Sequence, residues 1–256
     1  MVVGIEKFKE YFKDFTESYI IIGGTACDII LDDAGFTPRT TKDIDIILIV
    51  EALELEFVKQ FWAFIKEADY ERKEKSDEKQ KYYRFLNPKN KAFPKQVELF
   101  SRIPDIDLEE GTHLTPIPVD NDISSLSAIL LDDDYYNYTI EHSSVENNIN
   151  IANTEALICL KAKAFLDMTE QEAQGAKIDS KNIRKHKTDI FRMATMLTAE
   201  DEFELPNSIK EDLQSFAEMV KDDLPDKQIF KQLGIPDIDV NDLFKQFLGN
   251  FKLNLD

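Results

Sequence analysis

The chain has 256 residues, of which 43% are apolar, and carries a formal net charge of −19 from 50 acidic and 31 basic residues. This composition is typical of a folded globular protein with one large or two smaller domains, and it excludes a disordered chain. The acidic balance also argues against general binding to duplex nucleic acid, which requires a basic surface. A local basic pocket, a cationic substrate or a basic partner remains compatible with this charge.

No apolar run approaches the roughly 20 residues that a membrane helix requires, and residues 1–10 lack the apolar stretch of a secretory signal. The two cysteines, Cys27 and Cys159, lie in apolar patterns with helical spacing. We therefore expect them to be small core side chains rather than parts of a disulfide or a zinc site. A cytoplasmic protein without membrane contact is the resulting expectation.

The first half of the chain alternates between helical and extended patterns of apolar residues. Helices are predicted over residues 2–17, 25–31 and 53–68. Strands are predicted over residues 19–22, 43–50, 82–86 and 96–100. The charged residues 70–81 are expected to form a solvated turn, and residues 101–118 a loop. Residues 127–131 and 135–140 are predicted to pair as a hairpin, and residues 148–151 to form a further strand.

The pattern changes near Asn153, after which helical spacing dominates. Helices are predicted over residues 154–168, 183–197 and 209–220. The fold class is therefore α/β (α+β), with a mixed sheet and flanking helices in residues 1–152, followed by an α-helical domain in residues 153–256. We expect the two domains to share a cleft.

Gly23, Gly24 and Thr25 follow the first apolar strand and open a helix. Glycines allow the backbone to approach a ligand closely, and a helix N-terminus offers free N–H groups to phosphate. A threonine hydroxyl would add another donor. Taken alone, the pattern is more typical of an ordinary tight turn.

Two carboxylates, Asp43 and Asp45, open the next apolar strand and lie on the same face of it. Carboxylates at the edge of a core require a partner or a cation, and Mg²⁺ prefers oxygen ligands. Glu98 interrupts another apolar strand that is predicted to join the same sheet. A third acid there would complete a two-metal site and would accept a proton from an attacking hydroxyl. The alternative is that these acids simply face solvent.

Together, the Gly-Gly-Thr turn, T-K-D-I-D-I at residues 41–46 and V-E-L-F at residues 97–100 resemble the nucleotidyltransferase superfamily, with its DNA polymerase beta-like fold. In the second half, residues 160–167 (L-K-A-K-A-F-L-D) and 187–191 (K-T-D-I-F) resemble the C-terminal motifs of the AbiEii/AbiGii abortive-infection toxin-like family. These motifs run from Gly23 to about Leu197, which is most of the chain.

The resemblance implies a role for each matching residue. Gly23, Gly24 and Thr25 would hold the tail of a nucleoside triphosphate, together with lysines. The implied phosphate-binding lysines are Lys42, Lys161 and Lys163. Asp43, Asp45 and Glu98 would bind two Mg²⁺ ions, and Asp189 would make a polar contact across the cleft. Residues 161 and 163 are about 200° apart on a helix, so only one of the two lysines can face the site, and we favour Lys161.

One position departs from the family pattern. His186 stands three residues before Asp189, where members often carry an acid, and this puts the substrate side of the site in doubt. The residues around it form a basic patch or a solvated helix face. They are Lys177, Lys181, Arg184, Lys185, Lys187 and Arg192.

The resemblance therefore implies a Mg²⁺-dependent nucleotidyltransferase that moves a nucleoside monophosphate from a nucleoside triphosphate to an acceptor. The acceptor would be an RNA or tRNA end or a protein, and the chain would be a toxin with a cognate antitoxin or part of phage defence. One alternative is a transferase acting on a small cationic molecule of the antibiotic type, which suits the acidic charge. The other is a catalytically silent member that binds only a nucleotide or a partner.

Overall fold

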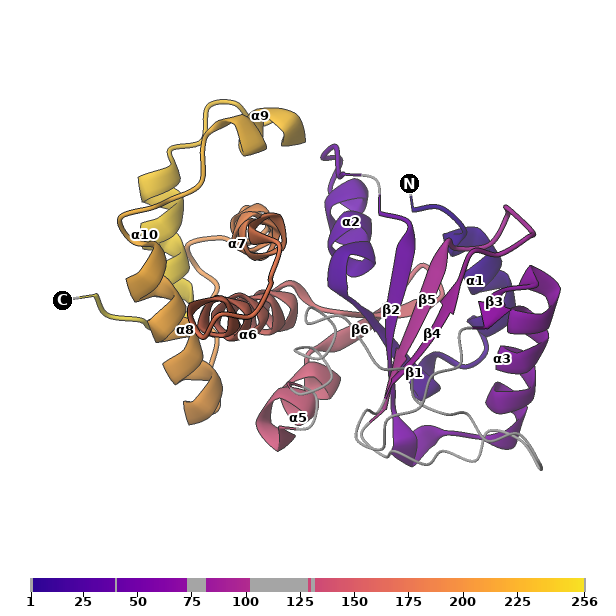
Figure 1. Ribbon diagram of the computed structural model, residues 1–256. Helices are drawn as coiled ribbons and strands as arrows, with labels where there is room; N and C mark the ends of the chain where they lie inside the picture. Colours follow the sequence, from indigo (N-terminus) through magenta and orange to yellow (C-terminus); the bar gives the residue numbers. More distant parts are fainter. Residues whose placement is uncertain (1, 40, 73–81, 102–128, 130–131, 256) are drawn as a thin grey trace. The chain divides into compact units, whose positions relative to one another are not determined.

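The computed structural model describes residues 2–39, 41–72, 82–101, 129 and 132–255 (Figure 1). The chain is a mixed α and β protein that divides into two compact units. The first comprises Met1–Ile29, Arg39–Asp120 and Ser143–Ala152, and the second comprises Ile30–Pro38, Asn121–His142 and Asn153–Asp256. The helical unit thus includes two segments that precede Asn153.

The first unit is built on one mixed sheet with the strand order β3-β4-β5-β2-β1-β7-β6 within the described residues. Its strands are β1 (Tyr19–Ile22), β2 (Asp43–Leu48), β3 (Glu71–Arg72), β4 (Tyr82–Leu86), β5 (Gln96–Phe100), β6 (Ser143–Glu146) and β7 (Ile149–Ala152). Strand β2 runs antiparallel to β1 and parallel to β5, while β1 is parallel to β7. All four residues of β1 are buried, which explains its unbroken apolar sequence.

Two amphipathic helices, α1 (Ile5–Phe12) and α3 (Leu55–Ala68), lie side by side against one face of this sheet (Figure 1). Their buried aromatic rings form the core of the first unit. Phe12, for example, lies with its ring centroid 5.3 Å from that of Phe64 and 5.6 Å from that of Phe57. Short 3-10 turns at Thr16–Ser18 and Val50–Ala52 flank β1 and β2, and helix α2 (Gly23–Asp33) begins directly after β1.

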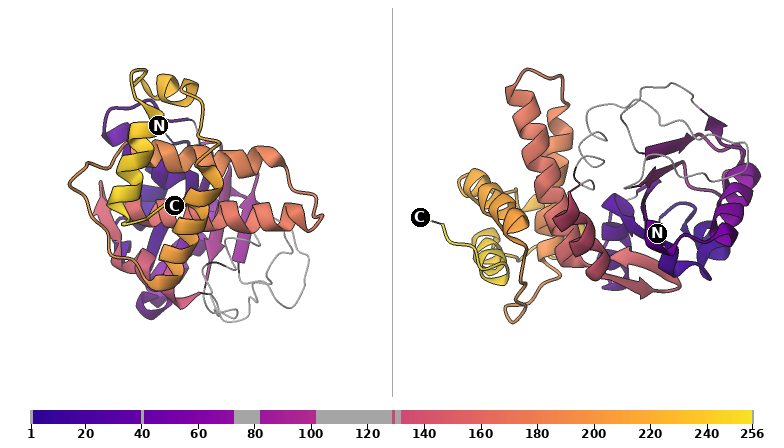
Figure 2. Two further views of the ribbon diagram at one scale, coloured as in Figure 1. Left: turned by 90° about the vertical axis from the view of Figure 1, so that its left-hand side faces the viewer. Right: turned by 90° about the horizontal axis from the view of Figure 1, so that it is seen from below.

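The second unit is helical in its described residues. Its helices are α5 (Asp133–Glu141), α6 (Thr154–Ala173), α7 (Ser180–Ala194), α8 (Asn207–Val220), α9 (Gln228–Leu233) and α10 (Val240–Asn250). Figure 2 shows α6 and α7 as an antiparallel pair, and α6 also packs against α5 and α8. Helix α6 is buried on most sides, as its apolar sequence from Ala156 to Leu160 requires.

The predicted hairpin over residues 127–131 and 135–140 is wrong in its second arm, because residues 135–140 belong to helix α5. Asp132 caps this helix by accepting hydrogen bonds from the backbone N–H groups of Asp134 and Tyr135. Tyr135, Tyr136 and Thr139 are buried at helical spacing, so the cap and packing override the strand preference of the tyrosines. The first arm lies outside the described residues apart from residue 129.

The hairpin in this part of the chain is instead β6–β7. Its turn residues Asn147 and Asn148 have φ angles of 50° and 66°, as a two-residue hairpin turn requires. The strand predicted over residues 148–151 is therefore confirmed as β7. The predicted turn at 70–81 and loop at 101–118 fall mainly outside the described residues.

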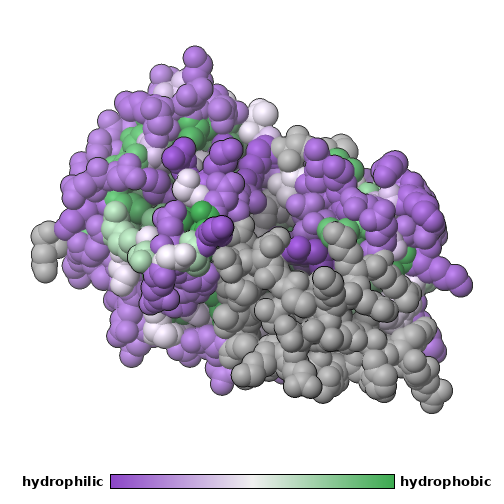
Figure 3. Space-filling view, viewed as in Figure 1, coloured by the Kyte–Doolittle hydropathy of each residue, from purple (hydrophilic) through white to green (hydrophobic). Residues whose placement is uncertain are grey.

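Hydrophilic side chains cover most of the described surface seen in Figure 3, and apolar atoms appear there in small patches. The large apolar side chains that are exposed include Val3, Leu55, Val145 and Met219, which are far apart in the sequence. No helix in the described residues is long and apolar enough to cross a membrane.

Candidate active site

Strand β2 brings Asp43 and Asp45 to one face of the sheet. Both are half-buried, and they alternate with the fully buried Ile44 and Ile46, so the predicted shared face is confirmed. Asp45 stands opposite Ile22 of β1 and opposite Glu98 of β5. Residues that are opposite one another on neighbouring strands project from the same face. Asp45 therefore lies beside Glu98 on this face of the sheet.

Glu98 is the centre of a row of polar side chains across three strands. It is 4% exposed, and it lies between Asp45 on β2 and Arg84 on β4. The Arg84 Nε donates to Glu98 Oε1 at 2.6 Å, and Gln96 Nε2 donates to the same oxygen at 2.7 Å. The acid that sequence reasoning selected is thus confirmed as buried within the sheet, and it has a basic partner that the sequence pattern did not reveal.

The pKa of Glu98 is raised from an ordinary value of 4.5 to about 8, chiefly by burial. The negative charge of Asp45 contributes to this rise, while the Arg84 guanidinium opposes it. At pH 7 a carboxyl group with this pKa is mostly protonated. The Asp45–Glu98 pair is therefore a place where a second negative charge is costly unless a cation is near.

The Gly23 turn is fitted to Asp45. Gly23 has a φ angle of 70°, and a Cβ atom placed on it would lie 2.0 Å from Asp45 Oδ2. The carboxylate of Asp45 thus packs against the first residue of α2, where the helix dipole favours negative charge. At Gly24, a Cβ atom would lie 3.1 Å from Arg39 Nη2, so a guanidinium group also lies at this turn.

Thr25 has a hydrogen-bond partner for its hydroxyl within the protein. Its side chain is fully buried, and its hydroxyl donates to the backbone carbonyl of Asp43. Asp28, one turn further along α2, is also buried and accepts from the Thr41 N–H at 2.9 Å. Both residues therefore fix the chain that leads into β2, and nothing in the sequence pattern signalled Asp28.

Two further predicted residues, Lys161 and Asp189, meet in the second unit. Lys161 Nζ lies 2.9 Å from Asp189 Oδ2, between α6 and α7, and the two residues are 5% and 3% exposed. Arg192 Nη1 lies 3.6 Å from the other carboxylate oxygen of Asp189. The sequence assigned each of these residues a role but did not predict that they form a buried ion pair.

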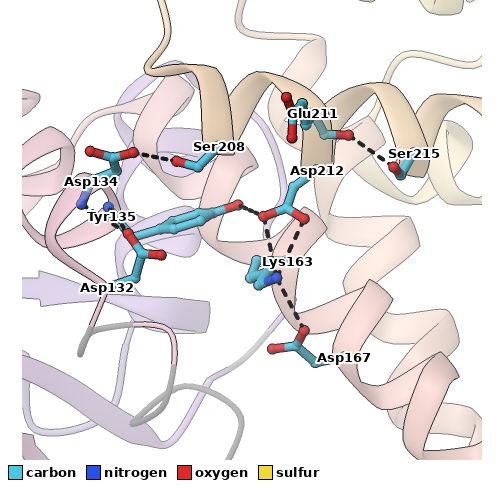
Figure 4. Close-up of polar contacts among 9 residues, drawn as sticks. All are labelled: Asp132, Asp134, Tyr135, Lys163, Asp167, Ser208, Glu211, Asp212 and Ser215. Atoms are coloured by element: carbon cyan, nitrogen blue, oxygen red, sulfur yellow. Dashed lines mark hydrogen bonds and ion pairs between the residues drawn. The ribbon is translucent and has the colours of Figure 1, made fainter.

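Lys163 faces a different set of side chains (Figure 4). Its Nζ lies 3.4 Å from Asp167 and 3.3 Å from Asp212, and Asp212 also accepts a hydrogen bond from the Tyr135 hydroxyl at 2.9 Å. Burial lowers the pKa of Lys163, but Asp167 and Asp212 together raise it above its ordinary value. The predicted phosphate-binding role of Lys163 is therefore not supported, because its charge is paired with two acids inside the helical unit.

The basic patch around His186 is smaller than its sequence suggests. Lys187 is buried and lies 2.6 Å from Asp223, and Arg192 contacts Asp189. The side chains of the patch that remain exposed are Lys177, Lys181, Arg184 and Lys185.

No group of three or more His, Cys, Asp or Glu side chains is arranged to hold a metal ion in the described part of the chain. Asp43, Asp45 and Glu98 are thus not a ready-made three-ligand cage. The oxygen donors nevertheless suit Mg²⁺, and the closeness of Asp45 to Glu98 is the kind of charge arrangement that a divalent cation relieves.

Comparison with known proteins gives no match to this chain among family models, curated proteins or solved structures. The functional proposal therefore depends on the residues and their arrangement.

Proposed function

We propose that the protein is a Mg²⁺-dependent nucleotidyltransferase with a nucleotidyltransferase-like sheet domain. The observation that carries the proposal is the pairing of Asp45 with Glu98 on adjacent strands, directly beside the Gly23 turn. Two carboxylates next to a glycine turn that opens a helix combine oxygen ligands for a divalent cation with N–H groups for phosphate.

In this proposal the backbone at Gly23 and Gly24 binds the triphosphate tail at the N-terminus of α2. Arg39, whose guanidinium lies at Gly24, neutralises charge on the departing pyrophosphate. Asp43, Asp45 and Glu98 would hold Mg²⁺, which when bound would lower the negative charge that develops on the transferred phosphate. Thr25 has a positioning role because its hydroxyl holds the backbone of Asp43.

The reaction would form a bond between an acceptor hydroxyl oxygen and the α-phosphorus. The bond from that phosphorus to the oxygen that bridges it to the β-phosphate would break, and pyrophosphate would leave. Glu98 in its ionised form would accept the proton of the acceptor hydroxyl. The acceptor is an RNA or tRNA end or a protein side chain, and the biological role proposed is that of a toxin with a cognate antitoxin or in phage defence.

Within the helical unit, Lys161 is proposed to bind a phosphate group, and Asp189 would hold the Lys161 ammonium in place through the 2.9 Å contact. A purely structural ion pair is the competing role for these two residues. A Lys161→Arg variant keeps the charge and distinguishes the two roles. Wild-type stability without nucleotide transfer would support the phosphate-binding role, whereas wild-type stability with full transfer would support a purely structural role.

The experiment is to incubate the protein with each labelled nucleoside triphosphate and Mg²⁺, adding total RNA, protein or cationic small molecules in separate reactions. We expect transfer that Asp45→Asn and Glu98→Gln abolish and that Glu56→Gln, at an exposed position of α3, leaves intact. Label in a small cationic molecule would favour the alternative acceptor. Absence of transfer with every acceptor contradicts the proposal.

One observation favours a second candidate function, in which the protein binds a nucleotide without transferring it. Glu98 already contacts Arg84 at 2.6 Å, and an acid engaged with arginine is a poorer metal ligand. This candidate predicts nucleotide binding, measured by calorimetry, that does not depend on Mg²⁺ and is unaffected by Glu98→Gln.

A further inference from the structure

A cavity of about 190 Å³ lies in the first unit, where β2 and β5 begin. Its charged lining consists of Lys42, Lys91 and Lys95, and we call it the lysine cavity. Its apolar lining includes Val3, Pro88 and Phe93. Lys42 directly precedes β2, and Lys95 directly precedes β5, so the cavity lies at the end of the sheet where Asp43 stands.

Among the described residues, no acidic side chain balances the charge of the lysine cavity. In the described residues, no carboxylate forms an ion pair with Lys42, Lys91 or Lys95, and the Lys91 ammonium donates to the carbonyl of Pro88 at 2.9 Å. Lys89, two residues away in the same turn, is paired with Asp69 at 2.8 Å. In a chain with 50 acidic and 31 basic residues, three lysines without acidic partners around one cavity indicate an anionic ligand.

Several contacts fix the backbone that carries these lysines. The Lys95 N–H donates to the Lys42 carbonyl at 2.9 Å, and the Tyr70 hydroxyl donates to the Pro94 carbonyl at 2.7 Å. Gly4 packs so closely on this segment that a Cβ atom there would lie 2.2 Å from the Pro94 nitrogen. A cavity with a fixed backbone loses less entropy on binding, which favours a specific ligand over diffuse attraction.

The size and chemistry of the cavity select the ligand class. Its volume is below the roughly 300–1,000 Å³ typical of drug-sized ligands, so it suits a phosphate with a small organic body. Lysines bind phosphate as point charges. An apolar wall beside them suits the carbon atoms of a nucleotide unit rather than a bare inorganic ion.

The lysine cavity and the acids of β2 lie on opposite faces of the sheet. Lys42 and Lys95 directly precede Asp43 and Gln96, which stand opposite each other, and side chains alternate along a strand. Phe93 of the cavity packs on Phe64 of α3, with the ring centroids 4.9 Å apart. We propose that the lysine cavity binds the phosphate of a nucleotide unit, either a free nucleotide or a unit of an RNA strand. This binding does not rest on the proposed function.

The test measures binding without Mg²⁺ or nucleoside triphosphate, so that it does not depend on transfer. A fluorescent 5′-phosphorylated oligoribonucleotide is titrated with the full chain, and binding is followed by anisotropy at several salt concentrations. The variants are Lys91→Met with Lys95→Met, and Lys91→Arg with Lys95→Arg. Lys89→Met is the matched control in the same turn, outside the cavity lining.

We expect the double methionine variant to weaken binding roughly tenfold or more and to reduce the salt slope by about 0.7 for each phosphate that the lysines no longer neutralise. The arginine variant and Lys89→Met should bind nearly as well as the wild type. Adenosine monophosphate that displaces the strand identifies a free nucleotide as sufficient, whereas displacement only by unlabelled strand identifies RNA. Three results would overturn the proposal. They are equal weakening of binding in Lys89→Met, displacement of the strand by inorganic phosphate at the same concentration, and wild-type affinity in the double methionine variant.

The two proposals fail separately. Lysine-dependent binding without any nucleotide transfer would leave the cavity assignment standing and contradict the proposed function. Nucleotide transfer that Asp45→Asn abolishes would support the proposed function. Unchanged binding in the double methionine variant would at the same time contradict the cavity assignment.

Discussion

The two buried charge clusters of this protein differ in how their charges are balanced. In the sheet, burial and the neighbouring Asp45 raise the pKa of Glu98 to about 8, and Arg84 compensates only part of this effect. In the helical unit, Lys161 and Asp189 are of opposite charge and lie 2.9 Å apart. The first cluster gains from a cation, whereas the carboxylate of the second already contacts Lys161 and Arg192. The sheet cluster is therefore a candidate binding site, whereas the Lys161–Asp189 pair has at least a structural role.

The largest expected effect is on the helical pair. Asp189→Ala should lower the free energy of unfolding by about 3–5 kcal/mol, because it leaves the buried Lys161 ammonium without its carboxylate. Lys161→Met should cost less, because Arg192 still contacts Asp189. Urea unfolding of the single and double variants measures this difference. Equal, small decreases for both would mean that the pair is not a buried unit.

The sheet cluster should show the opposite behaviour with pH. The folded-state pKa of Glu98 is raised, so the folded state binds more protons than the unfolded state between about pH 4.5 and 8. The stability that Glu98 contributes is therefore present at low pH and is lost as the pH rises through about 8. Glu98→Gln should remove this dependence, and the wild type should become less stable relative to the variant by roughly 2–4 kcal/mol from about pH 5 to about pH 9.

Denaturant unfolding at several pH values, with and without Mg²⁺, measures this effect. Mg²⁺ should restore the stability of the wild type at high pH and should have little effect on Glu98→Gln. Wild type and variant curves that stay parallel across this range would contradict the raised pKa of Glu98.

A smaller effect is expected at the turn beside the sheet cluster. Gly23→Ala should cost about 2–3 kcal/mol, because the added Cβ atom meets Asp45 Oδ2 and the φ angle of 70° is strained for alanine. Gly35→Ala is the matched control, since its φ angle is 81° but no atom lies within 4 Å of the added Cβ. The control should cost about 1 kcal/mol, measured by thermal unfolding. If the two variants are destabilised equally, the contact between Gly23 and Asp45 is not significant.

The smallest effect is expected at Lys163, whose side chain is partly exposed in the network of Figure 4. Lys163→Met should lower the free energy of unfolding by about 0.5–1 kcal/mol, as is usual for ion pairs near the surface. The decrease should shrink in high salt. A decrease as large as that of Asp189→Ala would show that the ion pairs of the two α6 lysines are equally important for stability.

The sequence predicted the parts of the site that depend on local pattern. Alternation along 43–48 predicted that Asp43 and Asp45 share a face, and the lone acid in V-E-L-F pointed to Glu98. Contacts between distant strands were not predictable, because the register that sets Arg84 opposite Glu98 is decided by pairing across the sheet. The burial of Thr25 likewise depends on β2, which lies 18 residues away.

The same limit explains the error at residues 135–140. Tyrosine-rich sequences favour strands when considered alone, but the cap at Asp132 and burial within the helical unit decide in favour of a helix. The partners of Lys163 were not predictable for a related reason. Its two acidic partners, Asp167 and Asp212, come from one turn along α6 and from α8, and only the fold brings Asp212 to it.

The segments of the two units alternate along the sequence, and this affects how the units can be exchanged by recombination. Ile30–Pro38 belongs to the helical unit although it lies between segments of the sheet unit, and the hairpin Ser143–Ala152 returns to the sheet after α5. Neither unit is thus encoded by one uninterrupted stretch of the gene. A recombination event at Asn153 would transfer an incomplete helical unit, so the two units are expected to be inherited together.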